Sequence, residues 1–377
     1  MSYLFSPRTI ALLALLAVLI ILFTFAALFT SLTENALDVR SSQGIKLGTP
    51  QFRRAIESIT RSPATPLDTE IEIFRDGRDF LDDLLKEING AKHSITITNY
   101  IFNPGKMTDD TFDALAKKAS QGVEVRLLLD DHGGGDAPKD KLEEMKQAGV
   151  KIASFRPVSF RTLTRLHRRT HVRAIVIDGK VGYTGGLAFQ DEWYSDGKSE
   201  KGWRDTMFKY DGSMARATQD QFNSLWRQTD GEILSGDNFY PPLPPALIPP
   251  PDSYFISLFH SPAPDISGDL LDIIWLTISG AQDHIYLATP YLTPPPEVLE
   301  ALTTAVERGV EVEILVPGPY TDTRIIRAAT RSYYEDLLKA GVHIYEYQPG
   351  RFHEKILTAD GEWSLIGSPN MDNRSAS

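Results

Sequence analysis

The chain has 377 residues, with 39 lysines and arginines against 50 aspartates and glutamates and a formal net charge of −11. Hydrophobic residues make up 42% and charged residues 24%, proportions that are typical of a folded globular protein and exclude a largely disordered one. The absence of cysteine excludes disulfides, thiolate metal sites and a cysteine nucleophile, and the acidic balance disfavours nonspecific nucleic-acid binding, which depends on Lys and Arg.

The N-terminal region contains an uncharged apolar run at residues 10–29, in which Thr24 is the single polar side chain. About 20 such residues span a bilayer as a helix, whereas a secretory signal has an apolar region of roughly 7 to 15 residues. We therefore expect residues 1–32 to be an uncleaved anchor in the cell membrane, with the span within residues 10–32. The flanking charges leave its orientation open.

Polar residues 33–70 are expected to form an extended connector, after which apolar runs alternate with helical patterns. The expected elements are, in chain order, a strand at 95–101, a helix at 111–120, a strand at 123–129, a helix at 140–148 and a strand at 150–155. Strands that alternate with helices predict an α/β fold with crossover connections.

The same order of elements recurs about 190 residues later in the sequence. Three pairs of segments match, namely 90–102 with 280–292, 122–130 with 309–317, and 148–152 with 340–344. A solenoid repeat has a period of about 20 to 50 residues, so this much longer period indicates two copies of one domain.

A proline-rich segment, YPPLPPALIPPP at 240–251, separates the two copies. Seven prolines exclude both a helix interior and a central strand. The sequence therefore predicts a first domain at 71–240, a linker at 241–252 and a second domain at 253–377.

A similar polar motif ends each copy. The candidate site residues of the first copy, from THVRAIVIDGKVGYTGG, are His171, Arg173, Asp178, Gly185 and Gly186. Those of the second copy, from FHEKILTADGEWSLIGSPNMDNR, are His353, Lys355, Asp360, Ser368 and Asn370.

An imidazole and a cation two residues apart on a strand face the same side of a sheet, as we expect for His353 and Lys355. This pair suits a phosphodiester, because the cation neutralises phosphoryl oxygens while a neutral imidazole attacks phosphorus and a protonated one releases an alcohol. The following glycines and Ser368 would let backbone and hydroxyl donors approach the phosphate. Asp178 and Asp360 each precede a glycine, so a turn-shaping role and a direct chemical role both remain open.

These residues resemble the phospholipase D superfamily, whose HxKxxxxD motif occurs once in each of two fused domains. The resemblance extends from about residue 70 to the end, and the stretches 178–193, 202–206 and 367–375 are most similar to bacterial cardiolipin synthases. It implies a bilobal pseudo-twofold α/β unit with both histidines at the domain interface, no metal or cofactor, and a phosphohistidine intermediate. In this family the first histidine, here His171, is usually the nucleophile.

Two positions of the first motif depart from the family pattern. Arg173 stands where lysine is usual, and Ala188 occupies the position that corresponds to Asn370. Arginine keeps the charge but presents a larger planar fork, so binding should survive while the rate changes. Five arginines within residues 160–173 are expected to hold lipid phosphates or approach anionic lipid.

The resemblance also implies an acid for each histidine. Asp205, in the GWRDT stretch, is expected to orient His171, and the acid that serves His353 is expected to lie beyond Ser377. On this interpretation His353 lacks its orienting partner and the second domain is C-terminally incomplete.

The resemblance implies a membrane-anchored phosphatidyltransferase that converts two phosphatidylglycerols to cardiolipin and glycerol. Its partners would be anionic phospholipids and the membrane, with no nucleic acid and no obligate protein partner. A phospholipase D-type hydrolase is an alternative, because the motif does not distinguish water from a lipid alcohol as acceptor. A nuclease and a scaffold with a decayed site are further alternatives, the latter motivated by Arg173 and Ala188.

Overall fold

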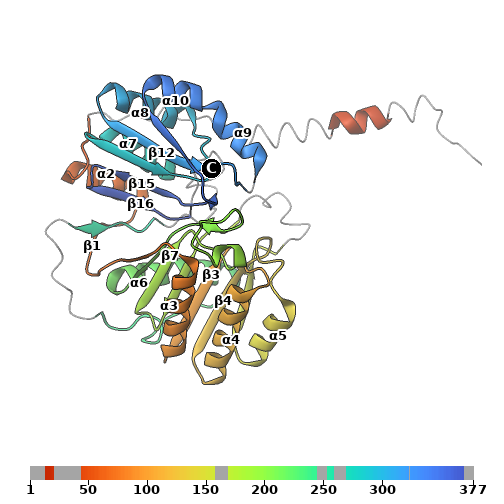
Figure 1. Cartoon of the computed structure of the whole chain (residues 1–377). Helices are drawn as coiled ribbons and strands as arrows, with labels where there is room; N and C mark the ends of the chain where they lie inside the picture. Colours follow the sequence, from red (N-terminus) through yellow and green to blue (C-terminus); the bar gives the residue numbers. More distant parts are fainter. Residues whose placement is uncertain are drawn as a thin grey trace, which may run out of the picture. The chain divides into compact units, whose positions relative to one another are not determined.

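The computed structural model describes residues 13–20, 44–157, 169–243, 253–258, 269–321 and 323–368 (Figure 1). The chain divides into two compact units, essentially residues 1–41 and 42–376. In the first, residues 13–20 are helical and exposed, while the rest of the expected span at 10–32 lies outside the described residues. No helix among the described residues combines the length and hydropathy that crossing a bilayer requires.

The second unit contains two α/β halves, and the first half is built on a seven-stranded sheet (Figure 1). In sheet order its strands are β2 (Glu72–Phe74), β9 (Met207–Tyr210), β7 (Val181–Gly185), β6 (Ala174–Ile177), β3 (Ser94–Asn99), β4 (Glu124–Asp130) and β5 (Lys151–Phe155). The strands β3, β4 and β5 are parallel, and the others pair antiparallel. Its helices are α3 (Gly77–Gly90), α4 (Lys106–Ser120), α5 (Lys139–Gln147) and α6 (Gly212–Thr229).

Alternation along β3 explains how this sheet is covered on both faces. Ile95 and Ile97 belong to the core formed with α3 and α4, whereas the buried Thr96 hydroxyl bonds Gln219 of α6 on the other face. Leu128 of β4 packs with the α6 side chains Phe222 and Trp226. Because successive side chains of a strand point to opposite faces, the near-continuous burial of β3 requires helices on both sides.

The second half repeats this plan with five strands among the described residues. In sheet order they are β13 (His343–Tyr347), β12 (Glu311–Pro317), β11 (His284–Ala288), β15 (Ile356–Ala359) and β16 (Trp363–Ile366). Its helices are α7 (Asp269–Gly280), α8 (Pro296–Glu307), α9 (Arg324–Ser332) and α10 (Tyr334–Ala340). The strands β3, β4 and β5 correspond to β11, β12 and β13, which confirms the two-copy α/β fold predicted from the repeat.

One face of the second sheet is less covered than its counterpart in the first half. Tyr286 is 44% exposed, Tyr345 49% and Ile366 37%, whereas Ile285, Leu287 and Ile314 on the opposite face are buried with α7 and α8. Among the described residues, no helix takes the place on this face that α6 takes in the first half.

The expectation of an extended connector at 33–70 is wrong for part of that segment, because α2 (Pro50–Thr60) is a helix. Thr49 caps it by accepting the Phe52 backbone N–H at 3.2 Å, and proline occupies the first turn. Phe52 and Ile56 share one face and are buried in the core of the second half. A helix that precedes the first half in sequence therefore packs in the core of the second half.

Candidate active site

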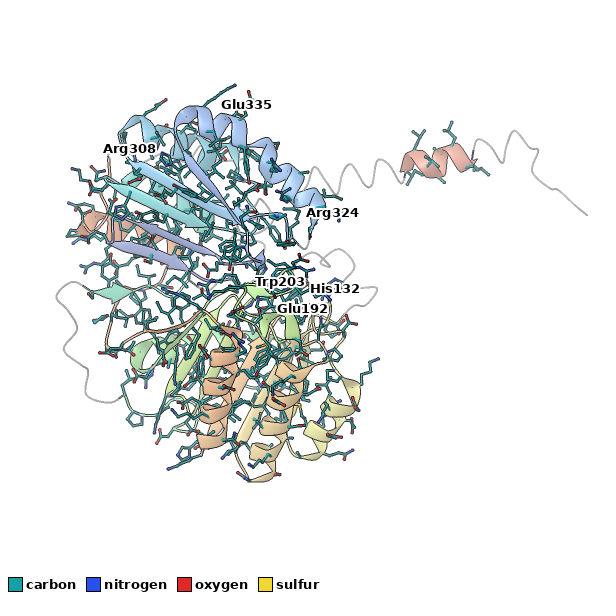
Figure 2. The ribbon with its side chains drawn as sticks, in the orientation of Figure 1. His132, Glu192, Trp203, Arg308, Arg324 and Glu335 are labelled. Atoms are coloured by element: carbon teal, nitrogen blue, oxygen red, sulfur yellow. The ribbon has the colours of Figure 1, made fainter. Side chains whose placement is uncertain are left out.

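Two short strands from different halves run side by side at the centre of the second unit. β8 (Trp203–Arg204) pairs in parallel with β14 (Arg351–Phe352), and the His353 N–H donates to the Arg204 carbonyl at 2.9 Å. Figure 2 shows Trp203 where the two halves meet. This pairing places the residue after β14, His353, next to the residue after β8, Asp205.

The carboxylate of Asp205 binds the imidazole of His353, with 2.7 Å between Oδ2 and Nδ1. The expectation that Asp205 serves His171, leaving His353 without an acid, is therefore wrong. The physical reason is the β8–β14 pairing, which carries the acid of the first copy across to the histidine of the second.

Burial and nearby charges set the protonation of this pair. Burial and the adjacent Lys355 ammonium lower the pKa of His353 to about 4, although Asp205 acts in the opposite direction. Burial raises the pKa of Asp205, but Lys355 and His353 outweigh it and the net pKa is lowered. Near neutral pH, His353 is therefore neutral and Asp205 ionised, so Nδ1–H donates to the carboxylate and Nε2 keeps its lone pair.

Lys355 and Arg173 occupy equivalent places in the two motifs. Lys355 donates from Nζ to the His353 carbonyl at 2.7 Å, and this Nζ lies 2.9 Å from His353 Nδ1 and 3.2 Å from Nε2. Arg173 donates from its guanidinium to the His171 carbonyl at 3.1 Å, and its Nε donates to the Leu187 carbonyl at 3.0 Å. Both cations are buried, so the arginine keeps the contact that the lysine makes and uses its fork for a second one.

Aromatic rings surround His353, and the candidate residues predicted from the sequence do not include them. Trp203 and Trp193 stand edge-on to the imidazole at 5.2 and 5.6 Å between ring centroids, and Tyr291 lies at 6.4 Å. Trp193 also donates to Asp205 Oδ2 at 3.4 Å. Trp203 lies two residues before Asp205 in the sequence, and this proximity was the signal that could have identified it. These rings cover most of the imidazole, whose side chain is 12% exposed, and thereby strengthen the electrostatic coupling around it.

His171, in contrast, is exposed and stacks on Tyr100, with 4.1 Å between ring centroids and 19° between the planes. Asp130 supports the segment that leads to it, because Oδ2 accepts the Thr170 N–H at 3.0 Å. A Cβ atom at Gly133 would lie 2.4 Å from the Tyr100 carbonyl, so only glycine fits beneath this tyrosine. Tyr100 and Asp130 are further positioning residues that sequence reasoning missed.

Asp178 and Asp360 lie away from the histidines, in the turns after β6 and β15. Asp178 accepts backbone N–H groups of residues 92–94, and Asp360 those of residues 282–284. Seven residues separate His171 from Asp178, which is roughly 20 Å along a strand at about 3.3 Å per residue. The prediction that places these two aspartates among the catalytic residues is therefore corrected. Both fix turns, in which their backbone φ values are 53° and 55°.

The glycines of the first motif have a steric role. A Cβ atom at Gly186 would lie 1.9 Å from Asp205 Oδ1, and one at Gly185 would lie 2.2 Å from the Thr206 carbonyl. The glycine pair therefore makes room for Asp205 and β9, and its approach to a phosphate stays a prediction. Ala188 is buried in the first core.

A cavity of about 380 Å³ is lined by residues of both motifs, including Arg173, Lys355 and Ser368. Most of its wall is apolar, from Met214 of α6 to Ile366 of β16. The two cations and Ser368 thus line one cavity. Asn370, and the arginines of 160–168, lie outside the described residues.

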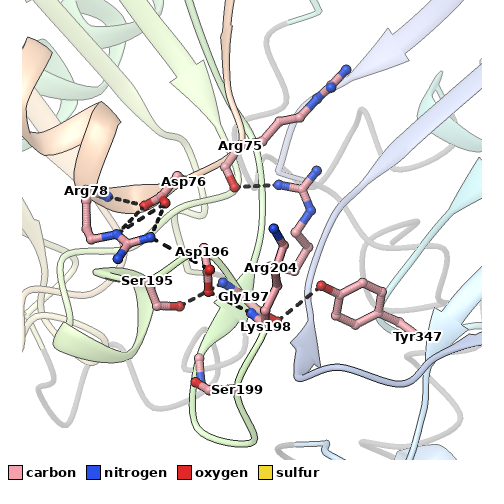
Figure 3. A network of polar contacts seen from close by, with 11 residues as sticks. Arg75, Asp76, Arg78, Ser195, Asp196, Gly197, Lys198, Ser199, Arg204 and Tyr347 are labelled. Atoms are coloured by element: carbon pink, nitrogen blue, oxygen red, sulfur yellow. Dashed lines mark hydrogen bonds and ion pairs between the residues drawn. The ribbon is translucent and has the colours of Figure 1, made fainter.

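Polar contacts hold the segment that precedes β8 against the second half (Figure 3). Tyr347 donates to the Gly197 carbonyl at 3.1 Å, and Arg204 contacts the Arg75 carbonyl. Arg204 also forms an ion pair with Glu354 at 3.2 Å. These bonds join residues far apart in sequence. They help to hold β8 beside β14, where Asp205 contacts His353.

Comparison with known proteins agrees with this geometry. A family model described as "Cardiolipin synthase, PLD-like domain" matches residues 84–226 and 274–377. The chain belongs to this phospholipase D-like family. The predicted resemblance is thereby confirmed.

Relatives of this family member cover most of the chain. It is 34% identical over 347 residues to the cardiolipin synthase of Alkalihalophilus pseudofirmus, covering 91% of the chain and 68% of that protein. It is 32% identical over 308 residues to the probable cardiolipin synthase YwiE of Bacillus subtilis, covering 81% and 60%. The chain thus spans 60% to 68% of the length of these two relatives.

A solved structure supports the fold of this family member. The phosphatidylserine synthase of Haemophilus influenzae superposes with a TM-score of 0.61 at 14% identity, covering 86% of this chain and 84% of that one.

Proposed function

We propose that this chain is part of a membrane-anchored phosphatidyltransferase of the cardiolipin synthase type, with two phosphatidylglycerols as substrates and cardiolipin and glycerol as products. The observation that carries the proposal is the cluster of His353, Asp205 and Lys355, beside a cavity that Arg173 also lines. The names of the relatives support the choice of substrate and reaction. The apolar run at 10–29 supports the anchor.

The first step forms a covalent intermediate. A ring nitrogen of His171 attacks the phosphorus of one phosphatidylglycerol, and the bond between phosphorus and the headgroup glycerol oxygen breaks. Glycerol leaves with a proton from His353, and the phosphatidyl group remains on His171. Arg173 and Lys355 neutralise the charge on the non-bridging oxygens.

The second step resolves the intermediate. A glycerol hydroxyl of the second phosphatidylglycerol attacks phosphorus, the bond between phosphorus and His171 breaks, and His353 takes the hydroxyl proton. His353 therefore ends the cycle protonated, as it began. Asp205 stabilises this protonated form.

The low pKa of His353 fits the second step directly, since a neutral imidazole is a base. For the first step the imidazole must carry a proton. An anionic phosphodiester beside Lys355 offsets the charge that lowers the pKa of His353, so substrate binding raises it. Proton uptake is thereby coupled to substrate binding.

The test uses the full chain with phosphatidylglycerol labelled in the headgroup glycerol. We expect equal amounts of cardiolipin and free labelled glycerol, together with a phosphatidyl adduct on His171 detected by mass spectrometry after denaturation at alkaline pH, where the phosphorus–nitrogen bond is stable. His353→Gln should abolish cardiolipin formation, whereas His93→Gln, at an exposed site, should preserve it. Phosphatidic acid without cardiolipin would refute transfer and establish hydrolysis by the same intermediate.

A further inference from the structure

The helix α9 carries an unusual exposed surface. Ile325 is 81% exposed, the highest value among the large hydrophobic side chains described, and Arg324 and Ala328 are also exposed. The side chain of Arg331 is 54% exposed. At 100° per residue Arg324 and Arg331 lie about 20° apart around the helix and Ile325 about 100° from Arg324, so the apolar side chain flanks the two arginines.

Charge distinguishes this face from the rest of the molecule. The helix has three arginines and no acidic residue, in a chain with a net charge of −11. Glu346 balances Arg327, at 3.1 Å, and lies 4.0 Å from Arg331. Arg324 forms no ion pair with another residue in the part of the chain that the structure describes. The exposed face of α9 is therefore cationic, whereas the net negative charge of the whole chain repels anions.

The position of α9 relates this face to the candidate active site. Figure 2 shows Arg324 on the side of the second half that faces the first, far from Glu335 of α10. The segment before the helix reaches the first half, because Tyr320 donates to Glu200 at 2.9 Å. The buried side of α9 is tied to the site as well: Thr330 Oγ1 accepts the Leu292 N–H at 3.2 Å, next to Tyr291, whose ring stands edge-on to His353.

We propose that α9 docks the folded unit on an anionic phospholipid bilayer, with Ile325 entering the headgroup region and Arg324 and Arg331 binding lipid phosphates. An isoleucine that enters a bilayer interface beside cations of the same helix contributes to binding through both apolar burial and attraction to anionic lipid. This docking is distinct from the N-terminal anchor. It does not depend on the proposed transfer reaction.

The absence of cysteine permits a direct test on the full chain. Ile325→Cys carries a single environment-sensitive NBD label, and the protein is reconstituted in vesicles of phosphatidylcholine alone or mixed with phosphatidylglycerol. We expect a blue shift and an intensity rise with the anionic vesicles only. The matched control is Ile233→Cys, at a site 65% exposed after α6, whose label should report water in both vesicles.

Charge reversal tests the arginines in the same system. Arg324→Glu in the labelled Ile325→Cys protein should abolish the shift, whereas Arg227→Glu on the exposed part of α6 should leave it intact. Salt should reduce the shift, because the Debye length falls to about 3 Å at 1 M. An Ile325→Cys label that stays water-exposed on anionic vesicles, or shifts equally on neutral ones, would overturn the proposal. Emission is independent of catalysis, so an inactive chain would leave this result readable.

Discussion

At the scale of single residues, the imidazole of His353 owes its state to neighbours from both halves. Asp205 orients it, burial and Lys355 hold its pKa low, and Trp193 and Trp203 pack edge-on against its ring. These effects act in different directions: burial and the lysine favour the neutral imidazole, whereas the carboxylate favours the charged form and fixes the tautomer.

The low pKa of His353 predicts a pH-dependent contribution to stability. The pKa is about 4 in the folded protein and about 6.5 when unfolded, so the unfolded form binds more protons between these values. The contribution is present above pH 6.5 and is lost as the pH falls toward 4, by roughly 2 to 3 kcal/mol at pH 4.5. Denaturant unfolding at pH 7.5 and 4.5 should show a smaller acid loss in His353→Gln than in the parent. His93→Gln should match the parent, and equal losses in all three proteins would disprove the assignment.

The turn role of Asp178 predicts a loss of stability without a specific loss of catalysis. Asp178→Ala leaves three backbone N–H groups without their acceptor, each of which costs about 1 to 3 kcal/mol where it is buried. Thermal unfolding should shift downward, and the turnover rate below the melting point should stay near that of the parent. Asp178→Asn, which keeps one acceptor oxygen, should lose less. A large fall in turnover with an unchanged melting temperature would instead place Asp178 in the chemistry.

At the scale of secondary structure elements, α2 shows how local and distant signals combine. Its Thr49-Pro50 start and the spacing of Phe52 and Ile56 are visible in the sequence, but they contain no information about which core the helix joins. The ring of Phe52 packs edge-on against Trp363 at 5.2 Å, and Trp363 begins β16. The helix thereby supports the strand that follows the second motif.

Removing this contact should destabilise the second half. Phe52→Ala is expected to lower the free energy of unfolding by about 3 to 5 kcal/mol, because it leaves a cavity against Trp363. Arg54→Ala, on the exposed side of α2, should cost far less. The measurement is denaturant unfolding followed by tryptophan fluorescence. If both variants have the same free energy of unfolding as the parent, α2 does not belong to the core.

The parts predictable from sequence were those with local or repeated signals. The strands β3 and β4 and the helix α5 follow from periodicity, and comparing the copies located His171 and His353. The pairing of Asp205 with His353 was not predictable, because a motif records spacing within one copy, whereas this contact depends on the β8–β14 register between copies. Likewise, the steric reason for Gly186 exists only where Asp205 packs against it.

At the scale of the whole molecule, the two halves share one set of chemical groups. Asp205 and Arg173 come from the first half, and His353 and Lys355 from the second, and Coulombic interactions connect all four. A rearrangement at the β8–β14 pairing would separate the acid from its histidine while leaving both sheets intact.

A double-mutant cycle across the halves measures this dependence. Asp205→Asn should slow cardiolipin formation by about 10²- to 10⁴-fold, the range for one acid–base group. His353→Gln should be at least as slow, and the double variant should be no slower than His353→Gln, because the carboxylate acts through the imidazole. Independent, multiplying losses would show that Asp205 acts elsewhere. Asp196→Asn, at a partly exposed site in the segment before β8, provides the matched control.

The contact between Asp205 and His353 also sets an order of events during protein synthesis. Their separation of 148 residues corresponds to roughly 7 to 30 seconds of translation at about 5 to 20 residues per second. Throughout that interval the nascent chain exposes the acid, Arg173 and the first histidine beside the ribosome without the second imidazole. The second imidazole therefore joins the reactive centre only after the acid, Arg173 and the first histidine have been synthesised.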